Sequence, residues 1–130
     1  MALTYLNFPD APPPPPTAAY SHAVAAGGFL FVTGQLGVDP KTGKVVSGGT
    51  AAEMRQVMKN LEIVLRNAGV MFAHVTMARI FLVDVSADYP AVNKIYAEYF
   101  AAGRYPARTT VGVTALALGC RVEVDMIAKL

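Results

Sequence analysis

Two charged side chains near the C-terminus, Arg108 and Glu123, are of the types needed to bind a small carboxylate and to orient a water molecule. A guanidinium offers a rigid fork that matches a carboxylate through two parallel hydrogen bonds. A glutamate can act on a water when its pKa is close to the operating pH and the water is within reach. Each residue also has a simpler interpretation: Arg108 is a solvated arginine or pairs with Asp125, and Glu123 is one of several charges on a solvated strand face.

The segments that carry these two residues are expected to be strands joined by a short glycine-containing bend. Polar and apolar residues alternate in 107–115 and again in 121–126, and a period of two is typical of half-buried antiparallel strands. In a simple hairpin Gly112 would lie opposite Glu123, with Arg108 about 13 Å further along the strand direction. We therefore expect one polar face to line a site, either with a small ligand between the two side chains or with groups added by a second subunit.

The N-terminal third is expected to form an extended arm and a hairpin. The five prolines Pro12 to Pro16 predict polyproline II, because proline fixes φ and removes a donor. We interpret this run as a stiff spacer that holds Tyr20 in place; a ligand for an aromatic-groove domain is the alternative. Residues 22–26 and 29–33 predict two strands that meet at a pair of glycines. Residues 2–8 are expected to form a short strand or arm.

The first helix is the clearest feature of the middle of the chain. Thr50 and Glu53 have the spacing of a capping box, and apolar residues then recur at intervals of three and four. Gly69 stands where a glycine that ends a helix is expected. The apolar, β-rich run 75–83 predicts a central strand that is covered on both faces.

A second helix is expected to begin at Asp88 or Tyr89, with Pro90 in its first turn, and to end at Gly103. The resulting order, β-β-β-α-β-α-β-β, predicts one α+β domain, residues 1–130, with residues 1–19 as an extended proline-rich arm. In such a fold the two helices pack on one face of a mixed sheet.

Composition limits the classes of partner and compartment. The chain has 130 residues and is 54% hydrophobic but only 15% charged, which is more apolar than an average soluble domain and suggests oligomer interfaces. A net charge of +2 is too small to favour nucleic acid or an anionic membrane as partner.

The single cysteine, Cys120, fits a reducing compartment. No apolar run approaches a membrane span and no secretory signal is recognisable, so we predict a cytoplasmic location. His22 and His74 lack partners at metal spacing, and no metal is expected.

Several short motifs together resemble the RidA/YjgF family of small imine deaminases. The run PARTTV that contains Arg108, followed by the VEV that contains Glu123, is similar to the family's C-terminal signature. Tyr20 and Ser21 are similar to its GPYSQ element. The other similar segments are 31–35, 39–43, 92–96 and 99–100.

The chain also departs from the usual family pattern at several positions. Ala18 and Ala19 stand where the family usually has Gly-Pro, and His22 stands where it has glutamine. Ala117 replaces the proline of the last bend, and serine or cysteine is common at the positions of Thr109 and Thr110. These departures bear on the choice of substrate more than on the ability of Arg108 to bind a carboxylate.

The resemblance implies a fold similar to chorismate mutase and a homotrimer with ligand clefts between subunits. It implies a cofactor-free enzyme that hydrolyses 2-imino or enamine acids to 2-keto acids and ammonia, with 2-aminoacrylate and 2-aminocrotonate (as 2-iminopropanoate and 2-iminobutanoate) as substrates. Arg108 would hold the substrate carboxylate and Glu123 would position the water. The further residues that the resemblance places at the cleft are Tyr20, Thr33, Gly34, Asn93 and Thr110.

Three other functions remain open. One is RNA binding linked to inhibition of translation, against which the near-neutral charge and the lack of a basic, aromatic stripe argue. Another is a holdase, in which the excess of apolar residues forms an exposed interaction patch. The third is a non-catalytic metabolite sensor, which the presence of both Arg108 and Glu123 disfavours because a sensor has no need of a water-positioning carboxylate.

Overall fold

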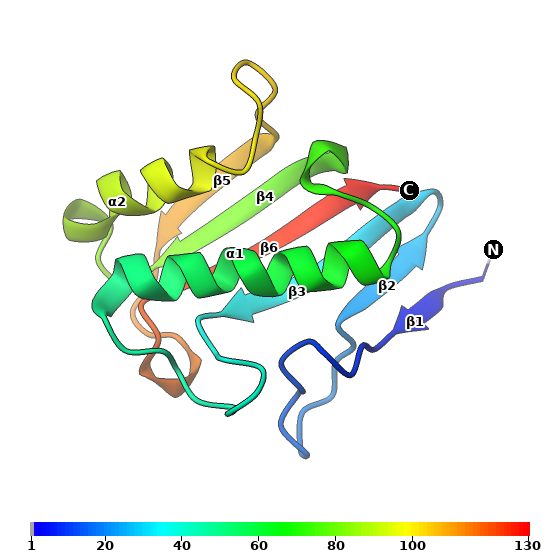
Figure 1. Ribbon diagram of the computed structural model, residues 1–130, viewed down its shortest axis with the longest axis horizontal. Coiled ribbons are helices and arrows are strands. Elements are labelled where there is room, and N and C mark those ends of the chain that lie inside the picture. Colours follow the sequence, from blue (N-terminus) through cyan, green and yellow to red (C-terminus); the bar gives the residue numbers. More distant parts are fainter. Residues whose placement is uncertain (1) are drawn as a thin grey trace.

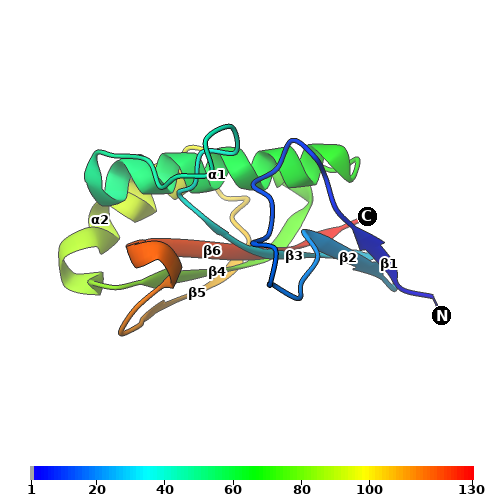
Figure 2. The same ribbon diagram turned by 90° about the horizontal axis from the view of Figure 1, so that it is seen from below.

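The structure, a computed structural model, describes residues 2–130 and consists of a six-stranded sheet with two helices on one side (Figures 1 and 2). Its elements, in order, are β1 (Thr4–Leu6), β2 (Ala23–Ala26), β3 (Phe29–Leu36), α1 (Gly49–Asn67), the 3₁₀ turn η1 (Phe72–His74), β4 (Val75–Leu82), α2 (Val85–Ala97), β5 (Ala107–Gly112), the 3₁₀ turn η2 (Ala117–Gly119) and β6 (Val122–Lys129). The predicted α+β class and order of elements are confirmed. No helix in this part of the chain is both long and apolar enough to cross a membrane.

The strands lie in the spatial order β1-β2-β3-β6-β4-β5. All neighbours are antiparallel except β4 and β5, which are parallel. The predicted hairpin between the last two strands is therefore wrong, because β4 lies between β5 and β6. A parallel pair needs a crossover rather than a tight turn, and α2 supplies it. Strand β6, with apolar residues at every second position, takes a place inside the sheet under α1, while the more exposed β5 forms an edge.

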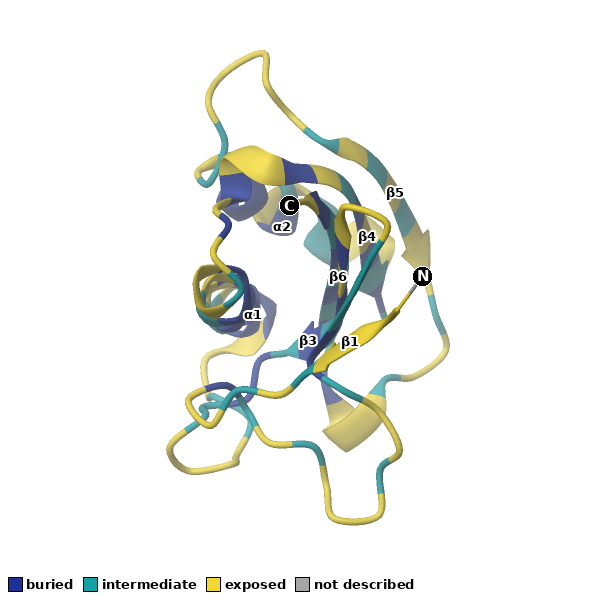
Figure 3. Cartoon of the chain, turned by 90° about the vertical axis from the view of Figure 1, so that its right-hand side faces the viewer, coloured by how far each residue is buried: buried dark blue, intermediate teal, exposed yellow. Residues whose placement is uncertain are grey.

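The core fills the space between α1 and the sheet, and Figure 3 shows buried segments, in dark blue, on both α1 and the strands. Apolar residues of α1 at intervals of three and four are fully buried against alternate residues of β3, β4 and β6. The residues of α1 in this layer are Met54, Val57, Met58, Leu61, Val64 and Leu65. The periodicity seen in the sequence thus marks the helix face that contacts the sheet.

The opposite side of the sheet carries no helix (Figure 2). We call it the open sheet face; its residues on β3 to β6 include Phe31, Met77, Arg79, Phe81, Val111, Glu123, Asp125 and Ile127. Phe31 is 46% exposed and Val111 is 40% exposed. The prediction that residues 75–83 are covered on both faces is therefore wrong for the single chain, in which burial alternates along β4.

Both helices begin differently from the prediction. The residue before α1 is Gly48, with a left-handed φ of 113° and no side-chain cap. The Thr50 hydroxyl instead donates to Asp88 Oδ2 at 2.9 Å, and Glu53 Oε1 accepts the Arg121 backbone N–H at 2.8 Å. Tertiary partners have thus replaced the local capping box. The predicted end of the helix holds, since Gly69 follows α1 with a positive φ of 83°.

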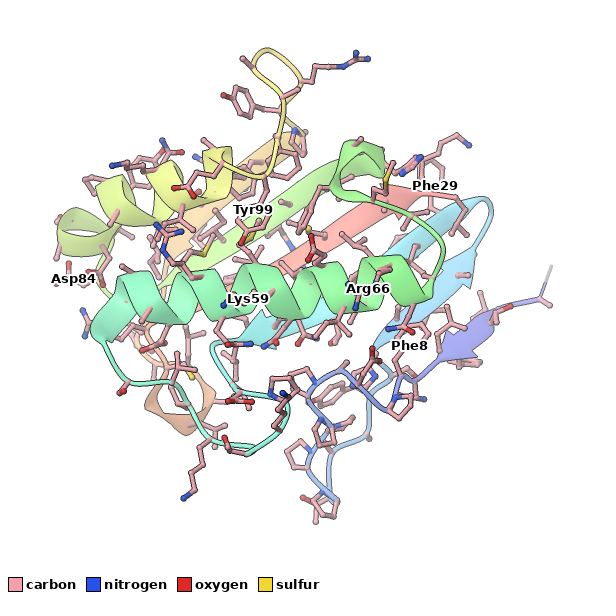
Figure 4. All side chains as sticks on the ribbon, viewed as in Figure 1. Phe8, Phe29, Lys59, Arg66, Asp84 and Tyr99 are labelled. Carbon is pink, nitrogen blue, oxygen red and sulfur yellow. The ribbon has the colours of Figure 1, made fainter. Side chains whose placement is uncertain are left out.

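The second helix begins four residues earlier than Tyr89. Asp84, labelled in Figure 4, caps it by accepting the Ala87 N–H at 3.1 Å. Pro90 is the sixth residue of the helix, not part of its first turn as predicted, and it lacks the N–H that would donate to the carbonyl four residues earlier. Asp88, one of the predicted caps, binds Arg121 at 3.0 Å instead.

Candidate functional site

Arg108 lies on the helix side of β5 and is held by three residues of α2. Its Nη1 donates to Asn93 Oδ1 at 2.9 Å and its Nη2 donates to the Tyr89 hydroxyl at 2.8 Å. The Tyr96 ring lies beneath the guanidinium, 4.9 Å from its centroid to Cζ. The three α2 residues are spaced by four and three, which places them on one side of the helix. No carboxylate among residues 2–130 forms an ion pair with Arg108, so its charge is available to a ligand.

A cleft of about 460 Å³ lies beside this guanidinium, within the size range of small-molecule sites. Asn93, Tyr96, Tyr105 and Arg108 line it together with Ala97 and Pro106. This end of the molecule also holds two buried hydroxyl oxygens, Tyr96 Oη and Thr110 Oγ1, that have no hydrogen-bond partner among the described residues. Burial raises the pKa of Tyr96 to about 12, against the opposing charge of Arg108. The phenol therefore stays protonated.

Glu123 lies on the open sheet face, beside Gly34 in the irregular part of β3. Burial raises the pKa of its carboxyl, and the charge of Asp125 raises it further. A Cβ on Gly34 would lie 2.8 Å from Glu123 Oε2, so the glycine leaves the space that this side chain occupies. Burial raises the pKa of the Tyr20 phenol, and the charge of Glu123 raises it further.

A shallow hollow of about 790 Å³ adjoins this group on the open sheet face. Tyr20, Thr33 and Gly34 line it, as do Arg79 and Asp125. Arg79 and Asp125 form a bidentate ion pair, with its shorter contact at 2.6 Å. Asp125 is therefore occupied by Arg79, and the simple interpretation of Arg108 as the partner of Asp125 is wrong.

The structure divides the predicted site residues into two groups on opposite faces of the sheet. Arg108 pairs in register with Ala78, which faces the helices, whereas Glu123 pairs with Phe81 on the open sheet face. Asn93 and Thr110 lie on the Arg108 side; Tyr20, Thr33 and Gly34 lie on the Glu123 side. The expectation that one polar face of a hairpin carries both charges is therefore wrong, because the intervening β4 fixes the two strands in different registers.

Two residues of this arrangement were not identified as site residues from the sequence. The sequence predicts Tyr89 as a possible helix cap and includes Tyr96 only in the segment 92–96 that is similar to the family, yet both contact Arg108. The sequence feature that could have identified them is the spacing of positions 89, 93 and 96, which puts two aromatic rings and an amide on one helix face. Among residues 2–130 no group of His, Cys, Asp and Glu side chains is arranged to hold a metal.

This protein is a small α+β domain with a cleft that holds a guanidinium, which has no carboxylate partner among residues 2–130, and with a carboxyl of raised pKa on the opposite sheet face. The family model described as endoribonuclease L-PSP matches residues 11–130. The chain belongs to this family, which is the YjgF/RidA family recognised in its motifs.

Relatives and solved structures agree with this assignment. The 2-iminobutanoate/2-iminopropanoate deaminase of Rattus norvegicus is 43% identical over 110 residues, covering 85% of this chain and 79% of the relative. Protein DfrA of Myxococcus xanthus is 44% identical over 128 residues, covering 98% of this chain and 96% of the relative. The crystal structure of the Rid family protein YyfA from Yersinia pestis, described as of unknown function, superposes with a TM-score of 0.92 at 35% identity, covering 99% of this chain and all (100%) of that one.

Proposed function

We propose that this protein hydrolyses reactive 2-imino and enamine acids, such as 2-aminoacrylate and 2-aminocrotonate, to 2-keto acids and ammonia. The observation that carries the proposal is the Arg108 guanidinium, oriented by Asn93 and Tyr89 in a cleft and free of any carboxylate partner among the described residues. Such a group suits a ligand that brings its own carboxylate. The mammalian relatives named as imine deaminases support the same chemistry.

In the proposed reaction Arg108 binds the substrate carboxylate and the enamine tautomerises to the imine. A water oriented by Glu123 adds to the imine carbon, passing one proton to the carboxylate while the imine nitrogen takes up another from solvent. Glu123 then returns its proton to the amine nitrogen of the carbinolamine. The C–N bond breaks, ammonia leaves, and the carbonyl of the 2-keto acid forms as the hydroxyl proton is released to solvent. The raised pKa of Glu123 makes it a better proton acceptor than an ordinary glutamate. No cofactor is needed in this scheme.

The two groups must come from different subunits, since they project from opposite faces of one sheet. We propose a closed homotrimer in which the Arg108 side of one subunit meets the Glu123 side of the next. Such head-to-tail contacts use two different surfaces of each chain and close into a ring. The exposed apolar residues of the open sheet face, Phe31 and Val111, fit burial in this contact. Asn93 and Thr110 would then bind substrate from one subunit, and Tyr20, Thr33 and Gly34 from the other.

The activity is tested by generating 2-aminoacrylate with a serine dehydratase and trapping it with semicarbazide in the presence of the protein. The wild type should lower the trapped amount and Arg108→Ala should not. Arg55→Ala is the matched control, because Arg55 is an exposed arginine of α1 paired with Glu98 at 3.3 Å, away from the cleft. A wild type that leaves the trapped amount unchanged would contradict the proposed reaction. An active Arg108→Ala would contradict the proposal that Arg108 binds the substrate carboxylate.

The shared site is tested by mixing two inactive variants, Arg108→Ala and Glu123→Gln, after reversible dissociation of the subunits. In a randomly mixed cyclic trimer three quarters of the rings are hybrid, and each hybrid ring contains one intact site of three. About a quarter of the wild-type activity should therefore return. If both residues acted from the same chain, every site would contain one substitution and no activity would return.

A further inference from the structure

The buried side chain of His22 joins two backbone points of the N-terminal arm. His22 is 2% exposed. Its Nδ1 lies 2.9 Å from the backbone nitrogen of Phe8, and its Nε2 lies 2.8 Å from the carbonyl oxygen of Pro12. A backbone N–H only donates and a carbonyl only accepts, so the ring must accept at Nδ1 and donate at Nε2. The contacts therefore select one form of the side chain, the neutral imidazole with its proton on Nε2.

These two bonds attach the arm to the beginning of β2. The Phe8 ring, labelled in Figure 4, stacks on the imidazole with 6.2 Å between centroids and 6° between planes. The backbone of His22 is itself fixed: its N–H donates to Asn7 Oδ1 at 3.3 Å, and its carbonyl accepts the Thr33 N–H at 3.0 Å. His22 thus connects the arm to the strand that holds Gly34, and it stands two residues from Tyr20 on the Glu123 side of the site.

The three strands at this edge of the sheet offer no charge to stabilise a second proton on the ring. Strands β1, β2 and β3 carry no Asp, Glu, Lys or Arg. The arm between the two bonded points carries one acid, Asp10, whose carboxylate accepts the Asn67 amide at 2.9 and 3.1 Å. The nearest charged residue along the last turn of α1 is Arg66, which is exposed. A proton added at Nδ1 would face the Phe8 N–H donor, and that hydrogen bond would be lost.

We propose that His22 is a positioning residue: a neutral imidazole latch that holds the proline-rich arm, and with it Tyr20, against the Glu123 side of the site. Protonation of Nδ1 opens the latch. Its effect on turnover rests on the proposed function, whereas the movement of the arm does not. The latch makes the site sensitive to acid in a way that a glutamine at position 22 would not, because a glutamine amide can accept from Phe8 and donate to Pro12 without titrating.

The test compares the wild type with His22→Gln from neutral pH down to the lowest pH at which both proteins remain folded. Over this interval kcat/KM of the wild type should fall about tenfold more than kcat/KM of His22→Gln, as expected for loss of a buried hydrogen bond. The ratio between the two proteins at each pH cancels the pH dependence of the substrate and of Glu123. Parallel profiles for the two proteins would overturn the proposal.

Two measurements test the latch without any substrate. The ¹⁵N chemical shifts of the wild-type imidazole at neutral pH should show a protonated Nε2 and an unprotonated Nδ1; the opposite tautomer would overturn the proposal. Hydrogen exchange in the peptide that spans residues 2–20 should accelerate at acid pH in the wild type relative to His22→Gln. If the arm opens as expected while neither protein hydrolyses imines, the latch stands and the proposed function fails. Equal exchange in both proteins would refute the latch itself, whatever the activity.

Discussion

Replacing Gly34 by alanine should displace the Glu123 carboxylate while leaving the fold intact. A Cβ at position 34 would lie 2.8 Å from Glu123 Oε2 and 2.9 Å from its Cδ, whereas favourable contacts between non-bonded heavy atoms are about 3.5 to 4.0 Å. The atoms in the way are the far end of a flexible side chain, so this side chain moves rather than the backbone. The carboxylate must shift by roughly 0.7 to 1 Å to restore normal contact.

The movement of the Glu123 side chain determines how much Gly34→Ala changes kcat and the free energy of unfolding. A shift of about 1 Å in a group that positions reacting atoms can lower the rate by about a hundredfold, so we expect kcat of Gly34→Ala to fall by about 10- to 100-fold. Overpacking in a rigid core costs about 1 to 3 kcal/mol. The half-buried Glu123 has room to turn toward solvent, and the free energy of unfolding should therefore drop by about 1 kcal/mol or less.

Gly37→Ala is a matched control, which should lose stability but keep its kcat. A Cβ on Gly37 would lie 2.8 Å from both Cα and Cβ of Glu53, a backbone atom of α1 and the first side-chain atom attached to it, neither of which can swing aside. This variant should lose about 2 to 3 kcal/mol of stability while its folded fraction keeps the wild-type kcat. Thermal or denaturant unfolding and the semicarbazide assay measure the two quantities. A Gly34→Ala variant with wild-type kcat would refute the idea that the placement of Glu123 determines the rate.

Three further variants test the surroundings of the site and the fold. Tyr89→Phe removes one acceptor from Arg108 and should lower kcat/KM by about tenfold in the same assay without changing stability; unchanged kinetics would contradict its role in orienting the guanidinium. Because burial, aided by Asp125, raises the pKa of Glu123, stability linked to its protonated form is present at acid pH and is lost as pH rises through the raised pKa. Glu123→Gln should therefore unfold at higher denaturant than the wild type at neutral pH and at equal denaturant in acid; equal midpoints at neutral pH would contradict the burial argument. Asn60→Ala removes a fully buried amide that donates to two carbonyls at 3.0 and 2.8 Å and should cost about 2 to 3 kcal/mol, whereas a loss below about 1 kcal/mol would show that water replaces both bonds.

The layers of this fold were predictable because the patterns that define them are local. The apolar stripe of α1 identifies its buried face without knowledge of any partner, and Gly69 marks its end by its own backbone conformation. The start of α1 was not predictable in this way. Thr50 and Glu53 have the spacing of a local cap, but their oxygens bind Asp88 and Arg121, which are distant in sequence. A cap competes with tertiary hydrogen bonds of similar strength, and the sequence does not show which prevails.

The candidate site was predictable residue by residue but not as an arrangement. Alternation in β5 and β6 indicates which residues of one strand share a face, yet it does not indicate how one strand relates to another. That relation depends on β4, which pairs with both and places Arg108 and Glu123 on opposite sides. The contacts of Tyr89 and Tyr96 with Arg108 depend on the docking of α2 over the sheet edge, which no pattern within the helix specifies.

The separation of the two charges has a chemical consequence under the proposed assembly. A guanidinium and a carboxylate at directly opposite positions on one face form an ion pair, as Arg79 and Asp125 do, and such a pair leaves neither group free for a substrate. In this fold the sheet itself keeps Arg108 and Glu123 apart within each chain. When a second copy covers the open sheet face, it removes water from Glu123, which raises the pKa of the carboxyl further, while an approaching guanidinium lowers it. A substrate carboxylate bound to Arg108 neutralises that guanidinium, so the loss of water becomes the dominant effect on the pKa of Glu123. Glu123 then accepts a proton most readily when substrate is bound and the intersubunit cleft is closed.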